Sequence, residues 1–76
     1  MSDLCFQIRP CMNVTDEYID ECDFEDADFF GVYFGKPGAM YNWCDFPTYE
    51  QAVSEATDLA RQWSVSVDDI AARTKP

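Results

Sequence analysis

The sequence predicts an α+β fold, a small antiparallel β-sheet with one main α-helix packed on one face. Two observations carry this prediction. Strand-like patterns occur at Leu4–Arg9 and in a long hairpin between Phe29 and Phe46. Apolar residues at helical spacing then follow a capping motif, which predicts a helix over 48–63. Because 76 residues leave room for one core, we expect a single compact acidic domain spanning 1–76.

The first strand is expected at Leu4–Arg9, where apolar and other residues alternate. Leu4, Phe6 and Ile8 would share one face of this strand, and that face would point into the core. Pro10 is expected to end the strand, because proline has no backbone N–H to donate to a neighbouring strand.

The hairpin is expected to consist of strands 29–34 and 39–44 around the turn sequence Gly-Lys-Pro-Gly at 35–38. A symmetric turn would pair Phe34 with Ala39, Val32 with Tyr41 and Phe30 with Trp43. One face would then carry Phe30, Val32, Phe34, Tyr41 and Trp43, and the other Phe29, Tyr33, Met40 and Cys44. We expect one face to pack on the helix and the other to be covered by the N-terminal segment or used for binding.

The helix is predicted from its cap and its apolar stripe. Thr48 and Gln51 have the spacing of a capping box. The residues expected to face the core, several of them small enough to let the helix lie close to the sheet, are Ala52, Ala56, Leu59, Ala60 and Trp63. Beyond the helix two alternatives stay open: a short edge strand around Val65 and Val67, or a short helix over Asp68–Arg73.

The charge balance restricts the function. Fifteen acids and five bases give a net charge of -10, and histidine is absent. Nucleic-acid-binding and polybasic membrane-binding proteins need Lys and Arg, so both classes are excluded. The longest uncharged run, Pro37–Cys44, is shorter than an export signal or a membrane-spanning helix, so we expect a cytoplasmic protein. The composition favours a binding protein with a positively charged partner.

The four cysteines are expected to be reduced and buried. No two of the cysteines, Cys5, Cys11, Cys22 and Cys44, are as close in the sequence as the paired ligands of a zinc site. Without an export signal, reduced thiols are favoured over a disulfide framework. We therefore expect no metal and no cofactor.

The acidic residues are concentrated in one segment. Residues 16–28 hold eight of the fifteen acids, and no base occurs between Arg9 and Lys36. These eight are the candidate partner-binding residues: Asp16, Glu17, Asp20, Glu21, Asp23, Glu25, Asp26 and Asp28.

The charge density of this segment can approach that of a nucleic acid. Fully extended, it would span about 43 Å with one charge per ~5 Å, and as a helix about 20 Å with one charge per ~2.5 Å. Duplex DNA carries one charge per ~1.7 Å of axis. On a strand, Glu21, Asp23 and Glu25 would form a row along one face; alternatively, Thr15 would cap a short helix through Glu21. The residues expected to anchor the segment to the core are Tyr18, Ile19, Cys22 and Phe24.

Other functions fit the residues less well. No particular pair of carboxylates is selected for catalysis, a cysteine nucleophile would lack an imidazole partner, and the chain has little room for a substrate pocket. We therefore expect that the protein is not an enzyme. The acids lack the spacing and the central glycine of an EF-hand. An irregular calcium site, a disordered interaction segment and a solvated acidic face without a partner stay as alternatives.

A compact acidic domain with a short antiparallel sheet, one helix and clustered carboxylates resembles the phage-encoded anti-CRISPR proteins that act on type I systems. Some members of that group imitate duplex DNA and block the surface of the Cascade complex that reads the protospacer-adjacent motif. The resemblance rests on the character of the whole chain. It implies a DNA-mimic inhibitor, with type I-C the favoured subtype, that binds the large motif-reading subunit of Cascade in the cytoplasm of a bacterial host.

A different class of binding protein is the alternative. An acidic antitoxin or immunity-type protein would bind a basic effector by shape and charge without imitating DNA. Such a protein would depend on exposed aromatic residues such as Tyr33 or Tyr41.

Overall fold

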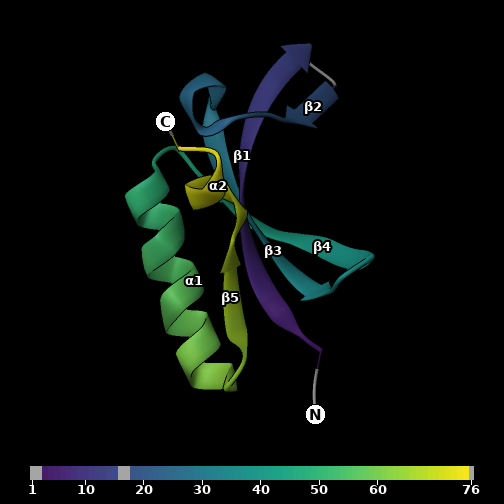
Figure 1. The fold of residues 1–76 in the computed structure, drawn as a ribbon, viewed down its shortest axis with the longest axis vertical. Helices are drawn as coiled ribbons and strands as arrows, with labels where there is room; N and C mark the ends of the chain where they lie inside the picture. Colours follow the sequence, from purple (N-terminus) through teal and green to yellow (C-terminus); the bar gives the residue numbers. More distant parts are fainter. Residues whose placement is uncertain (1–2, 16–17, 76) are drawn as a thin grey trace.

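The computed structural model describes residues 3–15 and 18–75. Its elements are, in order, β1 (Cys5–Thr15), β2 (Tyr18–Glu21), the 3-10 helix η1 (Phe24–Asp26), β3 (Phe29–Lys36), β4 (Ala39–Phe46), α1 (Tyr49–Trp63), β5 (Ser66–Asp69) and α2 (Ile70–Arg73). The sheet order is β2-β1-β3-β4 with antiparallel neighbours, and β5 pairs with β1 in parallel (Figure 1). The predicted α+β class is confirmed, and both C-terminal alternatives occur, a short strand followed by a short helix.

Strand β1 organises the sheet. Residues Cys5–Cys11 pair with β3 along one edge of β1. On the opposite edge, Cys5–Ile8 pair with β5 and Cys11–Thr15 pair with β2. Two strands from distant parts of the chain therefore share one edge of β1, end to end, and Figure 1 shows β1 running the length of the molecule, with β5 beside its lower part and β2 beside its upper end.

The predicted end of the first strand at Pro10 is wrong, because β1 continues to Thr15. The Pro10 carbonyl accepts a hydrogen bond from the Cys22 N–H at 3.0 Å. The nitrogen and carbonyl of one strand residue point to the same edge, so the Pro10 nitrogen also points away from β3. It faces the stretch of this edge between the residues paired with β5 and those paired with β2, where no backbone N–H of β1 is required for strand pairing.

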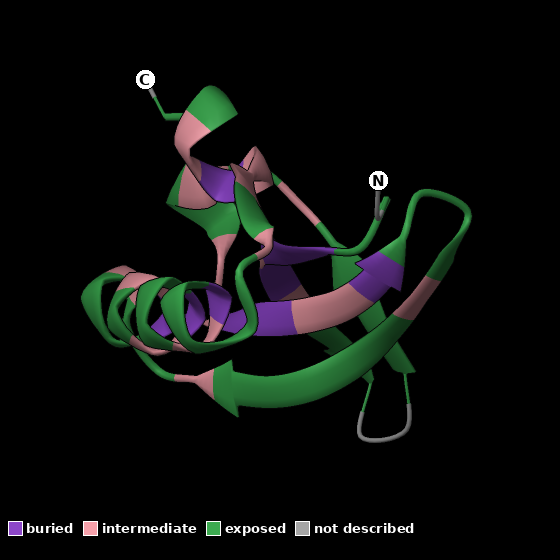
Figure 2. Ribbon diagram, turned by 90° about the horizontal axis from the view of Figure 1, so that it is seen from below, coloured by how far each residue is buried: buried purple, intermediate pink, exposed green. Residues whose placement is uncertain are grey.

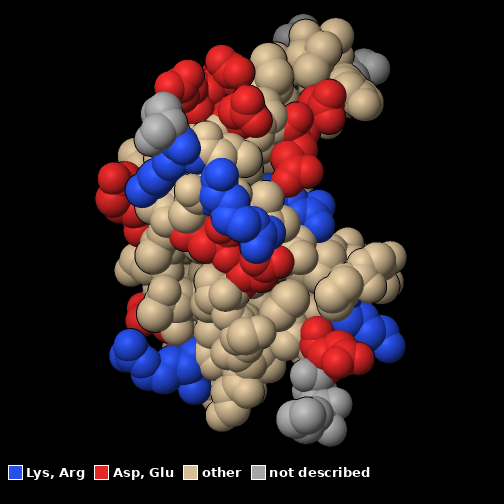
Figure 3. Space-filling model, in the orientation of Figure 1, with Lys and Arg blue, Asp and Glu red and all other residues tan. Residues whose placement is uncertain are grey.

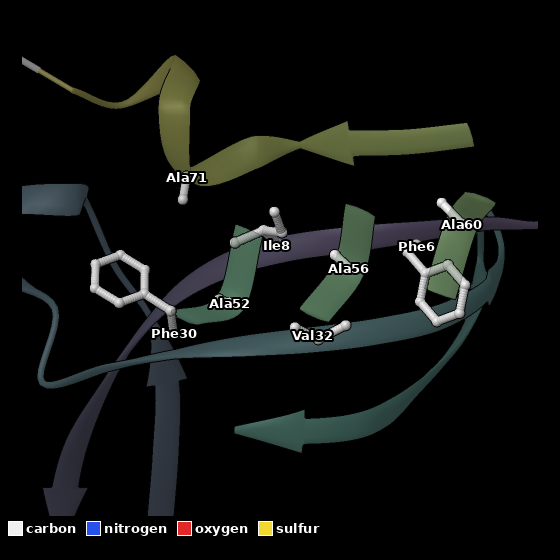
Figure 4. Close-up of a cluster of buried hydrophobic side chains, with 8 residues drawn as sticks. All are labelled: Phe6, Ile8, Phe30, Val32, Ala52, Ala56, Ala60 and Ala71. Carbon is white, nitrogen blue, oxygen red and sulfur yellow. The ribbon is translucent and has the colours of Figure 1, made fainter. Parts of the chain in front are cut away.

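The core lies between the sheet and the two helices. Its buried residues come from β1 and β3 on one side and from α1 and α2 on the other (Figure 4): Phe6, Ile8, Phe30, Val32, Ala52, Ala56, Ala60 and Ala71. Three alanines at a spacing of four form the buried face of α1, as the sequence predicts. Leu4 and Trp63, both expected to face the core, are exposed, at 39% and 44%.

The predicted helix boundaries are confirmed by hydrogen bonds at the N-terminus. Thr48 is the N-cap, and its hydroxyl accepts from the Gln51 N–H at 3.3 Å. Gln51 Oε1 accepts from the Thr48 hydroxyl at 3.1 Å, so the return bond of the capping box goes to the hydroxyl. Ser64 ends the helix in the left-handed region with φ 55°.

The predicted hairpin register is wrong by two residues. Lys36 pairs with Ala39 and Phe34 with Tyr41, so only Pro37 and Gly38 form the turn. Gly35 stays in the strand at φ 149°, where an added Cβ would lie 2.2 Å from the Ala39 carbonyl oxygen. Glycine at that position allows the tight turn that the four-residue turn prediction did not include.

A β-bulge moves the pairing one residue further from the prediction, so that Phe30 pairs with Phe46 and not with Trp43. The register shifts between Val32 and Tyr33, so that Val32 pairs with Cys44. Cys44 therefore shares a face with Val32, whereas the sequence predicts that it shares one with Tyr33. The Trp43 ring packs against Phe34 and Trp63, with centroids 6.0 and 5.2 Å away, so Trp43 lies on the same face as Phe34, as the sequence predicts, and this face is the one that packs on the helix.

The other face of the sheet is covered by its own side chains. The Tyr33 ring lies on Gly31, where an added Cβ would come within 2.7 Å of it. The Arg9 guanidinium stacks 4.5 Å from the centre of the same ring and donates to Gln7 Oε1 at 2.6 and 3.0 Å. The N-terminal segment does not cover this face, because it forms β1 within the sheet. Figure 2 shows β4 exposed along the outer edge.

The close approach of α1 to the sheet gives a stability prediction. Replacing Ala56 with Leu should lower the free energy of unfolding by about 1–3 kcal/mol, since this fully buried position has no space for a larger side chain. Ser54→Leu introduces the same side chain at an exposed position of the same helix and should change stability by less than about 0.5 kcal/mol. Urea denaturation measures both, and equal losses would contradict this account of the core.

Candidate functional site

The candidate site is an acidic surface formed by six exposed residues of the described chain: Asp20, Glu21, Asp23, Glu25, Asp26 and Asp28. They lie on β2, on η1 and in the connections around η1. Figure 3 shows acidic side chains gathered at the end of the molecule where β2 and η1 lie. The other two predicted residues, Asp16 and Glu17, lie outside the described residues.

Acids of neighbouring segments lie along both edges of β1, near its C-terminal end. On one edge, β2 pairs Glu21 with Cys11 and Asp20 with Met12. On the other edge, the Asp28 N–H donates to the Cys11 carbonyl at 2.8 Å, and Asp28 Oδ2 accepts from the Asn13 N–H at 2.9 Å. Backbone hydrogen bonds thus fix acids on either side of one strand.

The 3-10 helix η1 is attached to the core through Phe24. The Phe24 ring contacts the rings of Phe30 and Tyr49, with both centroid distances at 5.1 Å. The Phe24 N–H donates to Thr74 Oγ1 at 2.9 Å, and the Lys75 ammonium lies 4.4 Å from the Tyr49 ring centre. Thr74 and Lys75, near the C-terminus, therefore hold the middle of the acidic segment against the core.

A hydrogen bond connects Tyr49 to the residues that precede Thr74 and Lys75. The Tyr49 hydroxyl donates to the Asp69 carboxylate. Burial first, and then this hydrogen bond, raise the pKa of Tyr49 to about 12. Asp69 also caps α2 by accepting from the Ala72 N–H at 2.9 Å, so one carboxylate connects α1 to the helix that precedes Thr74.

The predicted anchors and local conformations are only partly confirmed. Phe24 and Cys22 are partly buried, but Tyr18 and Ile19 are more than half exposed and do not anchor the segment. The helix capped by Thr15 is wrong, because residues 18–21 pair as a strand. The row of alternating acids is also wrong, since β2 ends at Glu21 and the chain turns into η1.

The carboxylates of the acidic surface form no ion pair with any described residue. The one salt bridge in the described chain joins Arg73 to Asp68 at 2.8 Å. Figure 3 shows Lys and Arg side chains close to the acids. Lys75 contacts the rings of Phe24 and Tyr49. The negative charge is therefore presented to solvent.

The half-buried thiol of Cys22 reports how closely some of these acids lie. Burial is the largest cause that raises the pKa of Cys22, followed by the Cys11 thiol and then by Asp26, Asp23 and Asp28. The carboxylates of Asp23, Asp26 and Asp28, which lie on η1 and in the connections around it, thus all oppose ionisation of one thiol, although they do not form a row.

The described part of the acidic surface forms neither a metal-binding cluster nor a ligand pocket. Within residues 3–15 and 18–75, no three His, Cys, Asp or Glu side chains converge in a way that could hold a metal ion, and no pocket is found. All four thiols are free; Cys5 and Cys11 are buried as predicted, whereas Cys44 is exposed because β4 is an edge strand. The arrangement offers outward-facing charge, which suits contact with a large charged surface.

Sequence reasoning missed the residues that hold the acidic surface in place. Thr74 and Lys75 act on Phe24 from the far end of the chain, and Asn13 positions Asp28 through its backbone N–H. None of these belongs to a recognisable motif, so no local signal identifies them.

The comparisons with known proteins give no relative. No family model, no curated protein and no solved structure matches this chain. Among the described residues, no helix has both the length and the apolar character needed to span a membrane.

The clustering of the acids can be tested through the Cys22 thiol. Replacing Asp23, Asp26 and Asp28 with Asn should lower the pKa of Cys22 towards its usual value, because less negative charge then opposes thiolate formation. Alkylation of Cys22 just above neutral pH should become faster, and mass spectrometry across a pH series measures the rate at each cysteine.

The matched control removes the same charge from α1 through Glu50→Gln, Glu55→Gln and Asp58→Asn. This variant should leave the alkylation profile of Cys22 unchanged. Equal shifts in the two variants would show that only net charge acts on the thiol and that these acids are not clustered around it.

Proposed function

We propose that this protein is an inhibitor that occupies the DNA-binding surface of a basic protein, with the acidic surface taking the place of duplex phosphates. One observation carries the proposal: six exposed carboxylates lie around one end of the sheet, and none of them forms an ion pair with a described residue. Acids neutralised within the fold would have little charge left to attract a partner.

The physical basis is charge complementarity. A Lys- and Arg-rich surface meeting these carboxylates releases the counterions held by both partners, which favours binding and makes it sensitive to salt. The hydrogen bonds of Asp28 and Phe24 hold parts of the acidic segment before binding. An array that is ordered in advance loses less entropy when it binds.

The resemblance to anti-CRISPR proteins indicates the proposed target. A Cascade subunit that reads a motif in duplex DNA must present basic groups to the phosphates. The proposed partner is therefore the large motif-reading subunit of a type I Cascade complex, with type I-C the favoured subtype, in the cytoplasm of a bacterial host. The proposed activity is binding without catalysis.

A second candidate is favoured by the exposed aromatic residues of β4. Tyr41 is 75% exposed, and β4 lies at the opposite edge of the sheet from β2. An acidic antitoxin or immunity-type protein would use such a surface to bind a basic effector by shape. Tyr33, the other residue proposed for that role, is held against Gly31 and Arg9.

A competition assay tests the proposed function. The protein should displace a motif-bearing duplex from purified type I Cascade complexes, and less effectively as the salt concentration rises. The variant Asp23→Asn, Glu25→Gln, Asp26→Asn should compete about tenfold less well or worse, because it releases fewer counterions. The α1 variant Glu50→Gln, Glu55→Gln, Asp58→Asn has the same net charge and should compete like the natural protein.

The same assay separates the two candidates. If the acidic-surface variant competes as well as the natural protein, the assignment of the site is wrong. If Tyr41→Ser abolishes binding while the acidic-surface variant still binds, the antitoxin or immunity-type function is favoured.

A further inference from the structure

We propose that an apolar end of the β1–β2 hairpin, beside the acidic surface, docks onto apolar side chains of the same basic partner. We call this end the hairpin tip; it consists of Val14, Tyr18 and Ile19 on β1 and β2. The inference rests on the proposed function and deepens it, since it states what else the DNA-binding surface of the partner must carry.

The hairpin tip exposes large apolar side chains at neighbouring positions. Val14 and Ile19 are each 52% exposed, and Tyr18 is 57% exposed. Asn13 pairs with Ile19 and Thr15 with Tyr18, and the register shift around Val14 places it between these pairs. Successive residues of a strand point to opposite faces, so Tyr18 and Ile19 make this end of the hairpin apolar on both of its faces. Exposed apolar residues grouped at one place mark interaction sites.

The fold does not need these side chains. The hydrophobic core and the partly buried residues packed against it include none of the three. Every residue of β2 is exposed, so this strand is held by its pairing with β1 and not by burial of its side chains. Polar residues of high strand propensity would serve the same structural purpose.

The neighbouring charges indicate what covers the hairpin tip. Asp20 and Glu21 follow Ile19 directly on β2, with Asp20 on the face of Tyr18 and Glu21 on the face of Ile19, so a partner that covers either face of the tip also meets a carboxylate. A second copy of the chain would bring like charges together, and an anionic lipid surface would be repelled. A protein surface with Lys and Arg around apolar side chains satisfies both parts of the hairpin.

The hairpin tip would give selectivity that charge alone does not supply. Carboxylates that imitate phosphate attract any protein with a basic DNA-binding surface, and this attraction weakens with salt. Apolar contacts are less sensitive to salt, and a few well-buried residues carry most of the energy of an interface. A partner whose basic surface includes apolar groups would therefore be held more tightly and for longer than other DNA-binding proteins.

Two synthetic peptides of equal positive charge test the inference and stand in for the basic partner. One has lysines separated by glycine, and the other has lysines separated by leucine and tryptophan. The natural protein should bind the lysine–leucine–tryptophan peptide about tenfold more tightly or better, as expected for apolar anchor residues. This binding should persist at about 1 M salt, where the Debye length is only about 3 Å. Fluorescence anisotropy measures both affinities.

Substitution of the hairpin tip should remove only the preference between the peptides. The variant Val14→Thr, Tyr18→Thr, Ile19→Thr keeps side chains suited to a strand and should bind the lysine–glycine peptide as the natural protein does. Tyr41→Ser removes an exposed aromatic residue elsewhere and should retain the preference. If circular dichroism shows that the triple variant is unfolded, the single substitution Tyr18→Thr carries the test, with a smaller loss expected.

Each other outcome overturns a defined part of the account. If the natural protein shows no preference, or the preference survives in the hairpin-tip variant, the inference is wrong and the proposed function stands. If Tyr41→Ser also removes the preference, the apolar contact lies on β4 and the inference is again wrong. If neither peptide binds even at low salt, the acidic surface does not attract basic partners, and the proposed function fails as well.

Discussion

The contact between the alanine face of α1 and the sheet supports the rest of the structure. Ala52, Ala56 and Ala60 are small enough to bring the helix close to the buried residues of β1 and β3. That approach places Tyr49 against Phe24, and Phe24 in turn holds η1 at the end of the sheet. The acids of η1 therefore depend on a contact made by uncharged residues elsewhere in the chain.

At the acidic surface, packing and charge act in opposite directions. Repulsion among neighbouring carboxylates favours an open, extended segment. The hydrogen bonds from Asn13 to Asp28 and from Phe24 to Thr74 and the ring contacts of Phe24 offset this repulsion. No ion pair within the described residues relieves it. The fold thus keeps its negative charge facing solvent, which is the property that the proposed function requires.

The parts of the structure that local pattern determines could be predicted from the sequence. The Thr48 cap, the alanine spacing of α1 and the core positions Phe6 and Ile8 follow from short-range periodicity. The predictions fail where distant segments decide the outcome and, in the hairpin, where Gly35 and a β-bulge set the register. Pro10 is tolerated because β5 and β2 meet on one edge of β1. The concentration of acids was visible in the sequence, but their arrangement depends partly on Thr74, fifty residues away from Phe24.

The salt dependence of the free energy of unfolding tests the central claim most directly, because it reports whether the acids are crowded and unpaired. Urea titrations at increasing sodium chloride should show the natural protein becoming more stable as the charges are screened. Replacing Asp23, Glu25 and Asp26 with their amides should raise stability at low salt and reduce this dependence more than the same charge removal on α1. Stability that stays constant or falls with salt, or an equal dependence in both variants, would contradict the account.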